Sequence, residues 1–191
     1  MPQMQWSQLR KQLGERLAPG LGNRLDLNQT RYRHSHDQEG EFWISFDKER
    51  IFSAGSMTYL SMLAKTARAA NERGASWAEA YGQAWPIMEA SGHMLLEKIN
   101  KDLLASLSMA VEDMLGHANP VLRALAVADK RFGKRRLAVF DAAGEHPLVL
   151  RVFQLRCQAE GVKPTIFASD EAGRKACALK SSTGKAPDVS H

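Results

Sequence analysis

The densest group of chemically active side chains in this sequence is a basic cluster around Gly133. Five lysines and arginines fall within the seven positions 130–136, and the glycine lies among them. Such side chains bind phosphate backbones because each contact releases condensed counterions, and glycine allows a ligand to approach the main chain. The pattern predicts a nucleic-acid-binding surface formed by Lys130, Arg131, Lys134, Arg135 and Arg136.

A second basic site on a predicted strand extends this hypothesis. Arg31 and Arg33 flank Tyr32, whose ring is suited to stacking on a base. The alternative for both groups is a solvated surface. In the basic cluster, cations near a helix end favour the helix dipole, a glycine ends the helix, and the remaining arginines pair with carboxylates.

Arg156 has an unusual position within a predicted helix over residues 147–160. On a helical wheel it falls in the apolar arc, together with Val152, Phe153 and Leu155. A buried guanidinium must be paired or strongly hydrogen-bonded. Two interpretations remain open: an ion pair with a carboxylate from another helix, or an arginine that contacts an anion or substrate in a pocket.

Two histidines alternate along the predicted sheet and precede a carboxylate. His34 and His36 share one face of a strand, and Asp37 follows. Imidazole and carboxylate are suitable ligands for a divalent metal, which makes a metal-dependent hydrolase a third, weaker hypothesis. An exposed strand end is the favoured explanation of the two histidines, and no H-E-x-x-H or paired C-x-x-C pattern occurs. We therefore expect no metal site and no cofactor.

Signatures of nucleophilic or nucleotide chemistry are missing from the sequence. There is no G-x-S-x-G, P-loop or G-x-G-x-x-G pattern. Cys157 has Arg156 beside it but no histidine at a local spacing that would activate a thiol. The sequence leaves enzymatic activity uncertain and favours a protein that is not an enzyme. The two cysteines, Cys157 and Cys177, are too few for a disulfide framework and are typical of reduced thiols in a cytoplasm.

The periodicity of apolar residues predicts an α+β fold. An amphipathic helix over 4–17 precedes strands within 24–53, where alternating residues indicate an antiparallel hairpin or three-stranded meander. From residue 57 to 161 the pattern is mainly helical. Ser76 and Glu79 form a capping box, and an apolar stripe of helical period extends from 95 to 114. The tryptophans are predicted to anchor the core between sheet and helices: Trp6, Trp43, Trp77 and Trp85.

Length and charge are consistent with one soluble domain. The chain has 191 residues, a net charge of +5 and 44% hydrophobic residues. Residues 119–191 carry 13 basic and 7 acidic side chains, so the positive charge is concentrated in the last third. We expect a single domain over 1–163, and a short element followed by a disordered tail over 164–191. No stretch approaches the length of a membrane span or a signal-peptide core, so the expected location is cytoplasmic.

Four sequence blocks resemble a family of small uncharacterised bacterial proteins. They are the Trp6-Ser7-x-Leu9 opening, Thr30 to Asp37 with Trp43-Ile44 following, Ala124 to Leu137, and His146 to Val149 with Leu155-Arg156. The similarity covers roughly residues 6–161. It implies a bacterial cytoplasmic protein and transfers no activity and no catalytic residue.

The leading hypothesis is therefore a nucleic-acid-binding accessory or regulatory protein. The alternative is a protein-interaction module, such as an inhibitor or antitoxin-like partner, without catalytic activity. That alternative depends on the possible open edges of the meander and on a helical face rich in methionine. The sequence predicts no membrane association and leaves the oligomeric state unknown.

Overall fold

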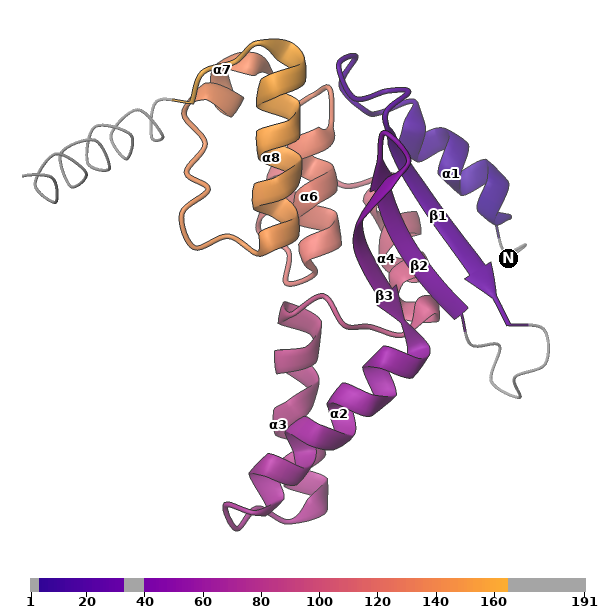
Figure 1. The fold of residues 1–191 in the computed structure, drawn as a ribbon, viewed down its shortest axis with the longest axis vertical. Helices are drawn as coiled ribbons and strands as arrows, with labels where there is room; N and C mark the ends of the chain where they lie inside the picture. The colour runs from indigo at the N-terminus through magenta and orange to yellow at the C-terminus, as the bar shows by residue number, and fades with distance from the viewer. Residues whose placement is uncertain (1–3, 33–39, 165–191) are drawn as a thin grey trace, which may run out of the picture.

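The change of periodicity near residue 24 marks a three-stranded antiparallel sheet (Figure 1). Its strands are β1 (Leu25–Arg31), β2 (Gly40–Phe46) and β3 (Glu49–Gly55), in the order β1-β2-β3. This confirms the predicted meander. Asp47 and Lys48 both have positive φ, 49° and 71°, as expected for the tight turn that joins twisted antiparallel strands. The structure used here is a computed structural model that describes residues 4–32 and 40–164.

The helices surround and extend this sheet, which confirms the predicted α+β class. The order along the chain is α1 (Trp6–Gly14), the three strands, α2 (Ser56–Asn71), α3 (Trp77–Ala90), α4 (Leu96–Ser106), α5 (Val111–Leu115), α6 (Pro120–Ala128), α7 (Lys134–Ala138) and α8 (Pro147–Glu160). The capping box forms as predicted, since the Ser76 side chain accepts from the Glu79 N–H and the Glu79 carboxylate accepts from the Ser76 N–H.

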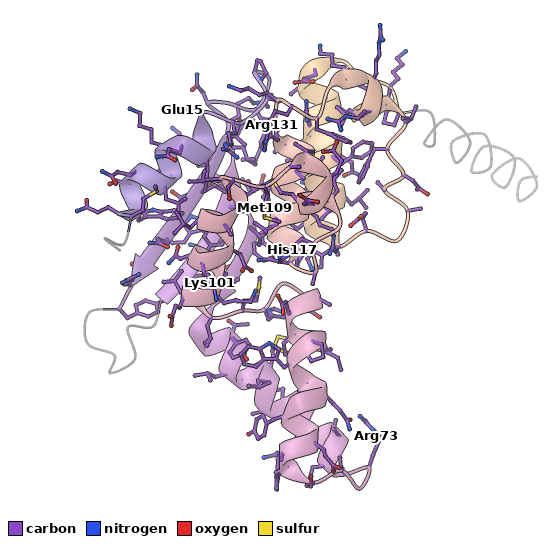
Figure 2. All side chains as sticks on the ribbon, turned by 180° about the vertical axis from the view of Figure 1, so that it is seen from behind. Glu15, Arg73, Lys101, Met109, His117 and Arg131 are labelled. Atoms are coloured by element: carbon purple, nitrogen blue, oxygen red, sulfur yellow. The ribbon has the colours of Figure 1, made fainter. Side chains whose placement is uncertain are left out.

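The core lies on one face of the sheet. Helix α1 packs on β1 and α4 packs on β2, so both cover the same face (Figures 1 and 2). Gly40 is required at this contact, because a Cβ there would lie 2.6 Å from Cδ2 of Leu96 and 2.2 Å from the Thr30 carbonyl oxygen. Helices α6 and α8 pack on each other beside the sheet, and their apolar faces belong to the same core.

The apolar stripe over 95–114 is divided between two helices. Helix α4 ends at Ser106, and α5 begins at Val111. The Arg16 guanidinium donates to the carbonyls of Ser106 and Leu107, and Arg131 donates to the carbonyl of Met109. These donors satisfy carbonyls that a continuous helix would use internally, so the helix can end although its apolar period continues.

Helices α2 and α3 form an antiparallel pair that projects from the body, and we call this pair the arm (Figure 1). Four buried alanines form the contact between them, in a cluster separate from the main core: Ala67, Ala70, Ala80 and Ala84. Small residues allow the two helices to approach closely. Met88 of α3 is buried, whereas Trp77, Tyr81, Trp85 and Ile87 remain about half exposed.

The prediction that all four tryptophans anchor the core is wrong for the two on the arm and for Trp43, which alternates with the core residues Phe42 and Ile44 and lies under Arg50; Trp6 packs against the core. Trp77 is 51% exposed and Trp85 is 49% exposed, whereas Trp6 and Trp43 are partly buried. The predicted element near 165–177 and the tail lie outside the described residues. Within the described ranges, no helix combines the length and the apolar character needed to cross a membrane.

Candidate functional site

The basic cluster lies on the surface around the start of α7, and most of its cations contact main-chain carbonyls. Lys130 Nζ donates to the Glu15 carbonyl at 2.8 Å, where α1 ends, and Lys134 Nζ donates to the Glu160 carbonyl at 3.2 Å, where α8 ends. Both carbonyls are at the negative end of a helix dipole. Gly133 is the N-cap of α7 rather than the end of a preceding helix, because α6 has already ended at Ala128.

The arginines of the cluster also have local partners. The Arg131 guanidinium donates hydrogen bonds to both carboxylate oxygens of Asp129, with Nη2 at 2.7 Å from Oδ2. This pairing raises the pKa of Arg131. Arg136 pairs with Glu112 and lies over the Phe132 ring at 5.0 Å. Arg135 alone among the five forms no hydrogen bond or ion pair with the described part of the chain. The geometry therefore gives four of these cations a structural role, while all five side chains remain exposed.

Arg156 is buried as predicted, with 2% of its side chain exposed. Its Nη1 donates to the carbonyls of Val127 and Asp129, so it caps the C-terminal end of α6. Its carboxylate neighbour is Glu160, one turn along the same helix, with Nε at 3.6 Å from Oε2. The ion-pair interpretation expected a partner on another helix, and the structure provides instead a carboxylate on α8 and carbonyls from α6. Burial lowers the pKa of Arg156, and the charge of Glu160 opposes that shift.

Arg131 and Arg156 converge on Asp129, from its carboxylate and its carbonyl respectively. The two arginines therefore stabilise the end of α6 through the buried Asp129, and an anion contact of Arg156 stays a prediction. Asp129 is 3% exposed. The adjacent chain is fixed as well, since Lys130 N donates to the Arg16 carbonyl and Ala18 N donates to the Ala128 carbonyl.

The second predicted basic site lies away from the first. Arg31 and Tyr32 are exposed at the end of β1, whereas α7 lies at the opposite end of the body (Figure 1). Figure 2 shows Arg131 near Glu15 and Met109 in that same upper region. Arg33, His34, His36 and Asp37 lie outside the described residues. The structure thus separates Arg31 and Tyr32 from the cluster that they were predicted to extend.

The described residues contain no group of three or more His, Cys, Asp or Glu side chains that could hold a metal ion. Cys157 is buried in α8, and burial raises the pKa of its thiol to about 11. A thiol with that pKa is protonated at neutral pH and is a poor nucleophile.

The most unusual surface belongs to the arm. Trp77, Tyr81 and Trp85 follow one another at four-residue spacing, so they lie along one side of α3. Between 45% and 51% of each residue is exposed. The Trp77 and Tyr81 rings are 6.0 Å apart, and Trp85 makes an edge-to-face contact with Tyr59 of α2 at 5.9 Å. We call these three exposed residues the aromatic stripe.

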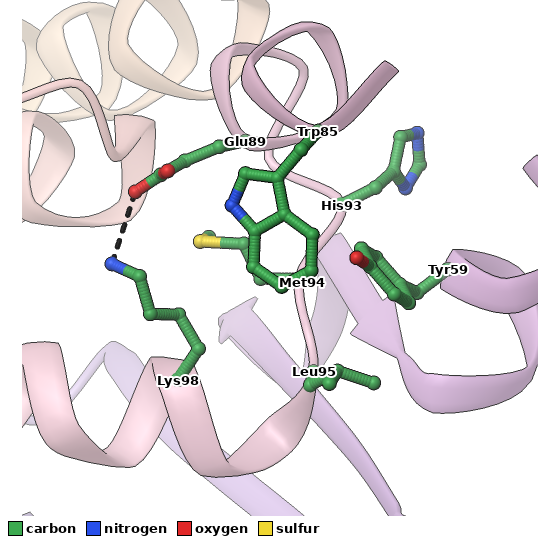
Figure 3. Close-up of a pocket in the computed structure, with 7 residues that line it drawn as sticks. All are labelled: Tyr59, Trp85, Glu89, His93, Met94, Leu95 and Lys98. Carbon is green, nitrogen blue, oxygen red and sulfur yellow. Dashed lines mark ion pairs between the residues drawn. The ribbon is translucent and has the colours of Figure 1, made fainter. Parts of the chain in front are cut away.

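An ion pair between Lys98 and Glu89 joins the base of the arm to the body (Figure 3). Lys98 of α4 binds Glu89 of α3 at 3.0 Å and Asp102 of its own helix at 2.7 Å. Burial alone would lower the pKa of Lys98, but the hydrogen bonds to the two carboxylates outweigh it and raise the pKa. Asp102 also accepts from the Asn119 amide, which begins α6. The network fixes the root of α3 and thereby positions the aromatic stripe.

A small cavity of about 20 Å³ lies beside this network, between Tyr59, Trp85 and the segment linking α3 to α4. Tyr59 and His93 are among its lining residues, and the Tyr59 hydroxyl and His93 Nδ1 are buried without a hydrogen-bond partner among the described residues. Burial raises the pKa of Tyr59. A space of this size is about that of one water molecule.

A model of the SF0329 protein family matches residues 5–157. This chain belongs to the SF0329 protein family. The match covers nearly the same residues as the resemblance noted from the four sequence blocks, and the family description states no activity. No curated protein and no solved structure matches this SF0329 family member. The assignment of a site in this SF0329 protein therefore depends on its own geometry.

The sequence did contain a signal for the arm surface. The alternation of Trp77, Tyr81 and Trp85 with Ala80 and Ala84 places large and small residues on adjacent sides of one helix. Because aromatic residues usually provide buried area, the sequence predicts that the large side faces the core. The tertiary structure reverses that assignment, since α2 packs against the alanines.

Proposed function

We propose that this SF0329 family member is a protein-interaction module whose arm binds a partner protein through the aromatic stripe. The observation that supports this proposal is the exposure of Trp77, Tyr81 and Trp85 on a projecting helix. Aromatic residues are enriched at the energetic centres of protein interfaces, and contiguous exposed apolar surface is uncommon on monomers. Leu60, Met62 and Ile87 add further exposed apolar area on the arm.

The shape and attachment of the arm support the same role. A projecting helical pair can enter a groove of a partner, and its alanine contact leaves its large side chains available for binding. The ion pairs of Lys98 at the base restrict the orientations of the arm, which reduces the entropy lost on binding.

The test is co-purification from cells that naturally carry the protein, followed by reconstitution with the purified partner. The triple variant Trp77→Ser, Tyr81→Ser, Trp85→Ser should lose that partner, with affinity reduced by 100-fold or more, since single hot-spot truncations cost roughly 2 kcal/mol or more. The matched control is Val139→Ser, which removes a 67% exposed apolar side chain from the body. Equal affinity of the triple variant and the control for the reconstituted partner contradicts the proposal.

Nucleic-acid binding remains the second candidate, supported by the exposure of all five cations of the basic cluster. A hydrogen bond to a neutral carbonyl leaves the charge of Lys130 and Lys134 available to a phosphate. The test measures binding to a short duplex DNA and a single-stranded RNA across a salt series. A Lys134→Gln, Arg135→Gln variant should bind more weakly and show a salt dependence reduced by about two phosphate contacts, whereas Lys65→Gln on the arm should change neither. Identical salt dependence in the two variants would remove this candidate.

A further inference from the structure

An open groove lies between α1, β1 and α4, away from the aromatic stripe and from the basic cluster. Its volume is about 600 Å³, which is within the range of pockets that hold small ligands. Met4, Trp6 and Leu9 line one wall, and residues of α4 line the other. Figure 2 shows Lys101 on that α4 wall.

The floor of the groove is formed by polar side chains of β1, at positions where the alternation of the strand predicts apolar ones. Alternate residues of β1 face the helices, and the first two of these, Leu25 and Leu27, are buried in the core. The next two on the same face are Gln29 and Arg31, and both line the groove. Gln29 is paired with Phe42 of β2, which is fully buried, so the polar floor begins directly at the edge of the core.

Two amide oxygens at this site are buried without a donor among the described residues. They are Oε1 of Gln29 and Oδ1 of Asn100, which belongs to α4. An acceptor buried without a partner destabilises the protein, because it has lost its hydrogen bonds to water and gained none. A bound molecule with N–H groups removes this destabilisation when the side-chain amides rotate toward it.

The α4 wall presents opposite charges at a fixed spacing. Glu97, Asn100, Lys101 and Leu104 recur at helical intervals and form one stripe facing the groove. Glu97 and Lys101 are exposed, and neither forms an ion pair within the described part of the chain. Four residues of α-helix rise about 6 Å, close to the roughly 7 Å span of two extended residues.

We propose that this groove binds a short apolar peptide of two or three residues with free ends. The peptide ammonium pairs with Glu97 and its carboxylate pairs with Lys101, near the additional positive charge of Arg31. Its apolar side chains pack between Trp6 and Leu104, and each peptide N–H donates to the amide oxygen of Gln29 or of Asn100. This proposal is independent of the arm and adds a ligand site to an interaction module.

The probe is the dipeptide Leu-Leu, compared with its N-acetylated and its C-amidated forms, and binding to the full chain is measured by titration calorimetry. We expect saturable binding of the free dipeptide, weakened roughly three- to fivefold by capping either end, as expected for loss of one solvent-exposed ion pair. In Glu97→Gln, acetylation should have no further effect while amidation still weakens binding. In Lys101→Gln the two effects should be exchanged.

Lys65→Gln, on α2 of the arm, is the matched charge control and should bind all three dipeptides as the wild type does. Denaturant unfolding verifies that each variant is folded, which is expected because both positions are exposed on α4. The proposal is overturned if the free dipeptide does not saturate the protein at millimolar concentration. It is overturned equally if the two α4 variants respond to capping as the wild type does, because binding would then ignore the peptide ends.

Discussion

At the residue scale, basic side chains hold the helix ends of this protein together. Arg16 caps α4, Arg156 caps α6, Lys130 binds the end of α1 and Lys134 binds the end of α8. The last carbonyls of a helix lack internal donors and carry the negative end of its dipole. A cation from a distant segment donates hydrogen bonds to these carbonyls and neutralises the negative end of the dipole. Basic side chains therefore contribute here to tertiary structure.

Arg156 should be the most sensitive of these residues. Replacing it with methionine in Arg156→Met leaves Glu160 buried without its countercharge and removes the donor to the Val127 and Asp129 carbonyls. We expect the free energy of unfolding to fall by about 3–5 kcal/mol, measured by urea denaturation. Arg151→Gln, on the exposed side of the same helix, should change it by less than about 0.5 kcal/mol. A similar loss in both variants would contradict the assigned role of Arg156.

The buried thiol of Cys157 predicts a dependence of stability on alkaline pH. Its pKa is about 11 in the folded protein and near 9 in an unfolded chain, because burial disfavours the thiolate. Because the pKa of Cys157 is higher in the folded protein than in the unfolded chain, the thiol's contribution to the free energy of unfolding is fully present below pH 9. This contribution is lost as pH rises from about 9 to 11. The loss approaches 2–3 kcal/mol, at about 1.4 kcal/mol for each unit. Urea denaturation across this range should show a smaller decline for Cys157→Ala than for the wild type; equal declines would exclude the thiol as the cause.

At the element scale, the arm is an independently packed unit. Its alanine cluster is separate from the main core, and α2 and α3 contact each other far more than they contact the body. A unit of this kind can open without unfolding the rest of the protein. The arm is therefore the part of the fold whose stability can be changed selectively.

Ala84→Leu tests this independence. Ala84 is fully buried between the two arm helices, so added methylenes must separate them, at a cost of roughly 1–3 kcal/mol. Hydrogen exchange should accelerate for amides of α2 and α3 and stay unchanged for those of α6 and α8. Ala78→Leu, at an exposed position of α3, should leave both sets unchanged. Equal acceleration throughout the molecule would show that arm and body unfold as one unit.

At the scale of the whole molecule, the fold extends beyond the residues that the family model matches. That match ends at Cys157, inside α8, whereas Glu160 pairs with Arg156 and the Val162 N–H donates to the Cys157 carbonyl. Gly161 has φ +66°, a left-handed conformation that ends helices and suits glycine. The complete C-terminal helix therefore needs residues past the match.

Two shortened chains distinguish these boundaries. A chain of residues 4–164 should unfold within about 0.5 kcal/mol of the full chain, because the described contacts are all retained. A chain that stops at Cys157 should lose about 3 kcal/mol or more, because Arg156 remains buried without Glu160. Denaturant unfolding of the three proteins measures both differences. A substantial loss in the 4–164 chain that a 1–164 chain also shows would place the domain boundary later than residue 163.

Local patterns of the sequence predicted much of the fold and little of the site. The meander follows from alternation in β2, and the turn at Asp47 and Lys48 separates two β-forming segments. The Ser76–Glu79 capping box depends on residues three apart. The strands, the turn and the capping box each depend on residues close together in the sequence, so they can be predicted without knowing a distant partner. The peptide groove was not predicted, because Trp6, Gln29 and Lys101 come from three elements that are far apart in the chain.

The sequence by itself determined the fold class and the placement of Arg156 on the apolar side of its helix, since both depend on local periodicity and polarity. Tertiary structure alone decided which partner Arg156 takes, which side of α3 faces solvent, and where the basic side chains bind. A helical wheel shows that a helix has two sides, but the neighbouring element decides which side is covered. For α3 that neighbour is α2, whose alanines pack against the small side and leave the aromatic side exposed.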